Sequence, residues 1–191
     1  MNSGAPSTPK APRDWTWPMV FGVFAAFWVV YLLVGRLDQF SDLDAGGPNT
    51  PVDYEWSLRD LDNNSVKFSN FQGKPLFVNV WATWCPPCVG ELPSIARLAA
   101  TPELKDKVAF VCISTDEGIN PVRSFMRGKD WPMTILQADR LPPVFMSDAI
   151  PATYLVSAEG RVVYEYVGGT DWDTPKVVAK LRKLVADSPQ G

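Results

Sequence analysis

The sequence predicts an α/β fold in which a central mixed sheet carries helices on both faces. Two continuous apolar runs, residues 76–81 and 108–114, are typical of strands buried on both faces. Apolar residues at helical spacing follow the first run, and a hairpin pattern and an amphipathic helix close the chain. With 191 residues, 46% of them hydrophobic, the chain is long enough for one domain with a substantial core and an appendage.

The first 35 residues predict a tail and a membrane anchor. Residues 1–14 are rich in Pro, Ser, Ala and Gly, which is typical of a disordered tail. Thr16 is the only hydrophilic residue between positions 15 and 34, and a helix of this length spans about 30 Å. Residues 15–35 are therefore expected to form a single transmembrane signal anchor. A cleaved signal peptide is the alternative, which the length of the apolar segment disfavours.

The charges beside this segment predict its orientation. Lys10 and Arg13 precede it, whereas Asp38, Asp42 and Asp44 follow it. Since basic residues stay on the cytoplasmic side, the tail is expected in the cytoplasm. The rest of the chain is then expected in the periplasm or another extracytoplasmic space, tethered to the inner membrane.

A linker is predicted between the anchor and the folded domain. Residues 36–53 contain glycines and prolines and show no periodicity, so we expect a flexible linker. The domain is expected over residues 54–188. Its first elements are strands at residues 54–58 and 65–68, which flank a polar turn and predict an antiparallel hairpin.

The strand at residues 76–81 leads into two cysteines spaced C-x-x-C at the start of a predicted helix. Cys85 is expected near the helix N-cap, where unpaired N–H groups and the helix dipole favour a thiolate. Pro86 and Pro87 have no N–H, so the nearest donor for the Cys85 sulfur is the N–H of Cys88. Cys88 lies one turn further in, which predicts an attacking and a resolving thiol.

The remaining elements follow the motif helix in order. They are a turn at residues 101–103, the strand at 108–114, a helix from Asn120 to about Gly128, a strand at 134–137, a hairpin of 154–156 with 161–167, and a helix from Thr174 onward. Cys112, in the second apolar run, is interpreted as a small buried hydrophobic residue, with a third redox thiol as the alternative.

Residues 81–88, W-A-T-W-C-P-P-C, together with Glu91 and Pro93, resemble the W-A-T-W-C-x-P-C-x-x-E-x-P signature of membrane-tethered thioredoxin-like proteins of the TlpA, ResA and DsbE type. The resemblance covers roughly residues 54–185. It implies a thioredoxin fold with an N-terminal hairpin. Ile150 and Pro151 resemble the segment of this family whose proline is cis and faces the cysteine pair.

The resemblance also implies roles for individual residues. Glu91 would take or relay the proton of Cys88, whereas a solvated helix glutamate is the alternative. Asn79 stands where cytosolic thioredoxins have a buried aspartate. Trp81 is expected in the core. The expected substrate-binding residues are Trp84, Pro86, Pro87, Ile150 and Pro151.

The implied activity is thiol-disulfide exchange, with Cys85 attacking a disulfide of a partner protein and Cys88 resolving the mixed disulfide. A transmembrane thiol reductase would supply the electrons, and a substrate such as apocytochrome c would receive them. No cofactor is expected beyond the cysteine pair. A disulfide-donating oxidase and a Cu(I)-binding metallochaperone are the alternatives.

Composition excludes other classes of function. A four-ligand zinc site within one chain is excluded because the sequence has no histidine and three cysteines, so no metal site is predicted. A net charge of -3 without a basic stripe argues against nucleic acid as a partner.

Overall fold

The computed structural model describes residues 21–29 and 48–188. The chain divides into two compact units, Met1–Ala45 and Gly46–Gly191, and residues 21–29 of the first form a helix. Within the described residues, no helix combines the length and the apolar character that crossing a membrane requires. The predicted tail and most of the predicted anchor and linker lie outside the described residues.

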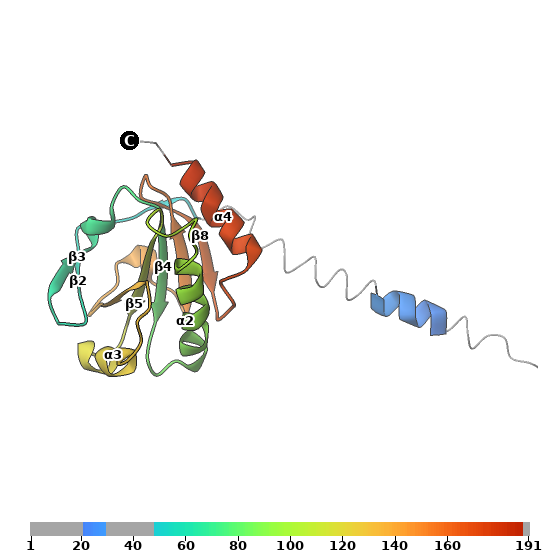
Figure 1. Cartoon of the computed structure of the whole chain (residues 1–191), viewed down its shortest axis with the longest axis horizontal. Helices are drawn as coiled ribbons and strands as arrows, with labels where there is room; N and C mark the ends of the chain where they lie inside the picture. The colour runs from blue at the N-terminus through green and yellow to red at the C-terminus, as the bar shows by residue number, and fades with distance from the viewer. Residues whose placement is uncertain (1–20, 30–47, 189–191) are drawn as a thin grey trace, which may run out of the picture. The chain divides into compact units, whose positions relative to one another are not determined.

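The second unit is built on one eight-stranded mixed sheet with the order β1-β8-β7-β4-β5-β6-β2-β3 (Figure 1). The central strands β4, β5 and β6 are parallel, and the other pairings are antiparallel, as the predicted mixed sheet requires. The strands are β1 (Thr50–Pro51), β2 (Ser57–Arg59), β3 (Ser65–Lys67), β4 (Leu76–Trp81), β5 (Ala109–Ser114), β6 (Thr134–Gln137), β7 (Ala152–Val156) and β8 (Arg161–Val167).

Helices connect and cover these strands. They are the α-helices α2 (Pro86–Ala99), α3 (Ile119–Met126) and α4 (Pro175–Ala186), and the 3-10 helices η1 (Phe68–Phe71) and η2 (Pro143–Phe145). Both α2 and α4 begin with proline at the first helical position, where the missing N–H costs no helical hydrogen bond, as the sequence predicts.

The two faces of the sheet are covered by different kinds of element. Successive side chains of β4 point to opposite faces. On one face, Asn79 donates a hydrogen bond to Glu91 of α2, and the Trp81 ring lies 5.3 Å from that of Phe125 in α3. The other face packs against η1 and η2. Its buried cluster includes Leu58, Phe68, Leu76, Val78, Val80, Phe145 and Tyr154.

Strand pairing begins earlier than the sequence predicts. Thr50 pairs with Val162, and the N–H of Val52 donates to the Gly160 carbonyl at 2.8 Å, so residues within the predicted linker form the edge strand β1. The sequence carries no sign of this strand, since two residues paired by their backbone at a sheet edge need no apolar pattern. The predicted N-terminal hairpin is confirmed as β2 and β3, in shorter strands than expected.

Candidate active site

The two cysteines lie where β4 gives way to α2. Cys85 is the N-cap residue of α2, and the N–H of Cys88 donates to its sulfur at an N···S distance of 3.3 Å. Pro86 and Pro87 occupy the first helical positions, where a missing N–H leaves no helical bond unmade. The two sulfurs form a disulfide with the Cα atoms 5.3 Å apart. The predicted N-cap position of Cys85 is therefore confirmed.

The two cysteines differ slightly in their exposure to solvent. Cys85 retains 4% of its surface, whereas Cys88 retains none. The residues beside Cys85 are exposed, and Trp84 keeps 68% of its surface in solvent. Cys85 is therefore the more accessible cysteine of the pair.

A second loop faces the disulfide. The peptide bond between Ile150 and Pro151 is cis, and the Ile150 carbonyl oxygen lies 3.8 Å from the sulfur of Cys85. The N–H of Gly168, which follows β8, donates to the Pro151 carbonyl at 2.8 Å. The cis bond and its position opposite Cys85, both expected from the family resemblance, are confirmed.

Glu91 is buried in the interior one helical turn beyond Cys88, with 3% of its surface exposed. Its carboxylate accepts three hydrogen bonds: from Asn79 Nδ2 at 2.7 Å, from Trp172 Nε1 at 2.9 Å and from the Thr170 N–H at 3.2 Å. Burial raises the pKa of Glu91, and the three donors oppose that rise. The alternative of a solvated helix glutamate is therefore wrong.

Asn79 lies in β4, between Glu91 of α2 and β7, the strand that follows the cis-proline Pro151. Its Nδ2 also donates to Thr153 Oγ1 at 2.9 Å. Its register partner in β5 is Cys112, which is fully buried and unbonded to another cysteine. Burial, and secondarily the charge of Glu91, raises the pKa of the Cys112 thiol far above its ordinary value. This agrees with the interpretation of Cys112 as a buried hydrophobic residue.

A buried carboxylate that the sequence does not single out fixes the segment leading into Cys85. Asp116 accepts hydrogen bonds from the Thr83 N–H at 2.9 Å, from the Thr83 hydroxyl at 2.6 Å and from the Ser114 hydroxyl at 2.6 Å. The one sequence signal for a role of Asp116 is its position just after the apolar strand at residues 108–114.

The loop after β8 is a second part of the site that the sequence does not single out. The indole N–H of Trp172 in this loop donates to Glu91, and the backbone N–H of Trp172 donates to Ser94 Oγ of α2 at 3.0 Å. A Cβ at Gly169 would lie 3.2 Å from the Cβ of Pro87, so the loop approaches the start of α2 closely. The adjacent glycines at positions 168 and 169 signalled a close approach, but the sequence does not identify the segment approached.

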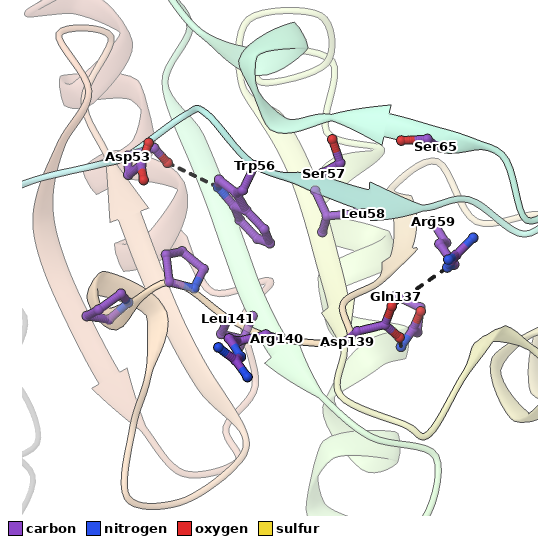
Figure 2. A pocket seen from close by; sticks show the side chains of 12 residues that line it. Asp53, Trp56, Ser57, Leu58, Arg59, Ser65, Gln137, Asp139, Arg140 and Leu141 are labelled. Atoms are coloured by element: carbon purple, nitrogen blue, oxygen red, sulfur yellow. Dashed lines mark hydrogen bonds and ion pairs between the residues drawn. The ribbon is translucent and has the colours of Figure 1, made fainter.

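A cleft of about 510 Å³ lies between β2 and the loop after β6 (Figure 2). Arg59 and Arg140 line it together with Asp139, which pairs with Arg59 at 3.8 Å. Neither cysteine of the pair nor Glu91 lines this cleft. Among the residues that the structure describes, no three His, Cys, Asp or Glu side chains are grouped so as to hold a metal ion.

The combination of a C-x-x-C disulfide at a helix N-terminus and an opposing cis-proline on a mixed sheet defines a thioredoxin-like protein. The Redoxin family model matches residues 47–181, and the chain belongs to this family.

Named relatives agree with this class. The chain is 29% identical over 114 residues to the thiol-disulfide oxidoreductase ResA of Bacillus cereus, covering 58% of this chain and 65% of the relative. For ResA of Bacillus subtilis the identity is 31% over 115 residues, covering 58% and 63%. The match thus spans just under two thirds of these relatives. The solution structure of an uncharacterized thioredoxin-like protein from Porphyromonas gingivalis matches with a TM-score of 0.57 and 25% identity, over 71% of this chain and 93% of that one.

Proposed function

We propose that this protein is a membrane-tethered thiol-disulfide oxidoreductase that reduces disulfides of a partner protein outside the cytoplasm. The observation that carries the proposal is the Cys85–Cys88 disulfide, with the sulfur of Cys85 in the N-cap position and 3.3 Å from the N–H of Cys88. A thiolate at that position gains a hydrogen bond and the favourable end of the helix dipole. The similarity of this chain to ResA proteins supports the same activity.

The first chemical step is the attack of the Cys85 thiolate on a disulfide sulfur of the partner. The new bond joins Cys85 to the partner, and the other partner sulfur leaves as a thiolate. The exposed Trp84 and the Ile150 carbonyl beside the Cys85 sulfur are suited to hold an extended partner segment against the reacting atom.

The second step is the attack of Cys88 on Cys85. Cys88 loses its proton to Glu91, its sulfur bonds to that of Cys85, and the second partner sulfur leaves as a thiolate. Two electrons pass to the partner, and the disulfide seen in the structure remains on the protein. Burial suits Glu91 to this role, because a carboxyl with a raised pKa is a better proton acceptor near neutral pH.

The oxidised protein then needs an electron donor. A transmembrane thiol reductase with a dithiol of its own would restore the two thiols by the reverse exchange. An anchor over residues 15–35 would keep the domain close to such a donor. Apocytochrome c, or a copper-site subunit of an oxidase, is the substrate that the family resemblance favours.

Activity is tested with the purified domain, residues 46–191, which form a compact unit. It should catalyse insulin reduction by dithiothreitol, and Cys85→Ser should abolish catalysis. A reduction potential near that of thioredoxin, about −270 mV, supports a reductase, whereas a value above about −150 mV would show a disulfide-donating oxidase.

Substrate and location need the full-length chain. In cells, Cys88→Ser should accumulate a mixed disulfide through Cys85, and the attached protein identifies the substrate. A membrane-impermeant maleimide should label reduced Cys85 in intact spheroplasts and leave a cytoplasmic thiol protein unlabelled. Labelling only after lysis would contradict the extracytoplasmic location.

A further inference from the structure

The two oxygens of the Glu91 carboxylate have different partners. Oε2 accepts hydrogen bonds from the indole N–H of Trp172 at 2.9 Å and from the backbone N–H of Thr170 at 3.2 Å. Oε1 accepts one from the side-chain amide of Asn79 at 2.7 Å. Indole and backbone N–H groups can only donate. A proton on Oε2 would therefore face two hydrogens that have nowhere else to bond.

The surroundings of Oε1 can accommodate a proton. An amide carries both a donor and an acceptor, so Asn79 can turn over and present Oδ1 instead of Nδ2. Asn79 Oδ1 is buried and has no partner within the described part of the chain. The other partner of Asn79 is the Thr153 hydroxyl, which can donate as well as accept and so can pair with either orientation of the amide.

We infer that Trp172 is a positioning residue, which keeps Oε2 of Glu91 unprotonated and directs the proton released by Cys88 to Oε1. The inference rests on the proposed role of Glu91 in the resolving step and adds a residue from outside the cysteine motif to it. An indole at this position thus selects the oxygen that takes part in the reaction, although it does not contact the sulfurs.

Trp172 is itself held in place. Its side chain is 2% exposed, and its ring packs edge-on against Phe77 at a centroid distance of 5.1 Å and against Tyr166 at 5.7 Å. Its backbone N–H donates to Ser94 Oγ on α2. These contacts fix the direction of the indole N–H.

Among the described residues, two titratable groups lie close to Glu91 in the fold. Cys88 comes one helical turn before it on α2, and Cys112 of β5 has a pKa that the Glu91 charge helps to raise. On the loop of Trp172, Asp171 and Asp173 both pair with Arg97. A pH profile of the resolving step over the neutral range therefore reports mainly on Glu91 and Cys88.

Trp172→Phe tests the inference because it removes the N–H and keeps an aromatic ring. The reduced domain is mixed with an aromatic disulfide such as Ellman's reagent, which releases one coloured thiolate when Cys85 attacks and a second when Cys88 resolves the adduct. Loss of the donor raises the pKa of Glu91, so the pH midpoint of the second phase should rise by about one unit. Below the midpoint the second phase should be about tenfold slower. Trp131→Phe is the matched control and should leave the midpoint unchanged.

Glu91→Gln separates failure of the inference from failure of the proposed role. If Glu91→Gln leaves the profile of the second phase as in the wild type, the role of Glu91 fails and the inference fails with it. If Glu91→Gln removes the Glu91-dependent step but Trp172→Phe behaves like the wild type, the inference alone is overturned. In the double variant Glu91→Gln/Trp172→Phe, the second phase should have the same pH profile as in Glu91→Gln alone.

A spectroscopic measurement on the unsubstituted protein covers the case in which Trp172→Phe does not fold. The indole N–H resonance of Trp172, assigned through its contacts with Phe77, should shift with pH along the same titration curve as the Glu91 carboxyl carbon. An indole resonance that stays constant while Glu91 titrates would overturn the inference.

Discussion

Replacement of Glu91 by Gln should make the stability of the protein less dependent on pH above the ordinary glutamate pKa. Because burial raises the pKa of Glu91, the folded state keeps a proton that the unfolded chain has already released. The contribution of Glu91 to stability is thus greatest below the ordinary glutamate pKa. Between that value and the raised pKa, the folded state holds the extra proton, and stability falls as the pH rises, by at most about 1.4 kcal/mol per pH unit.

The structure explains why glutamine is a suitable replacement. The carbonyl of the new side chain can take the place of Oε2 and accept from Trp172 and Thr170. Its NH₂ group can donate to Asn79 Oδ1 after the Asn79 amide turns over, since that oxygen has no partner among the described residues. Shape and hydrogen bonds are kept, and the buried charge is lost.

The assay is urea unfolding of the oxidised domain at a series of pH values from below the ordinary glutamate pKa to above neutrality. The oxidised form is used because neither Cys85 nor Cys88 then titrates. The free energy of unfolding of Glu91→Gln minus that of the wild type should grow with pH and then level off. The exposed Glu117→Gln serves as the control and should run parallel to the wild type. Parallel curves for Glu91→Gln would refute the raised pKa and the argument built on it.

Three further predictions follow from contacts around the site. Asp116→Ala should lower the free energy of unfolding by about 3 to 5 kcal/mol, because it leaves the Thr83 N–H without its acceptor and removes two more charge-assisted hydrogen bonds. Urea unfolding measures this loss, and Thr83→Val, which removes one of the bonds, is measured for comparison. Equal losses in the two variants would contradict the prediction. Gly169→Ala should lower stability by about 1 kcal/mol or more, since the new Cβ meets Pro87; an unchanged melting temperature would count against this close contact. Cys112 should resist iodoacetamide in the folded, reduced protein while Cys85 reacts, because burial raises the pKa of Cys112. Mass spectrometry before and after denaturation measures the labelling of each cysteine. Labelling of Cys112 in the folded protein would be inconsistent with the prediction.

The sequence was sufficient wherever the determining interactions are local. An apolar strand, two cysteines, prolines at the first helical positions and apolar residues at helical spacing predicted β4, α2 and the N-cap position of Cys85. All of these depend on neighbours within about one helical turn, so a short window of sequence contains the information. The cis bond before Pro151 was expected only through resemblance, since most X-Pro bonds are trans.

Tertiary structure alone decided the surroundings of Glu91. Its i+3 spacing from Cys88 placed the two on one side of α2, but a helix glutamate at that spacing can equally be solvated. Trp172, 81 residues away, reaches the carboxylate only because the loop after β8 folds back onto α2, and Asn79 reaches it because β4 lies beneath that helix. The pKa of a buried carboxyl depends on solvent exclusion and on donors brought from distant segments, and neither can be read from residues adjacent in the chain.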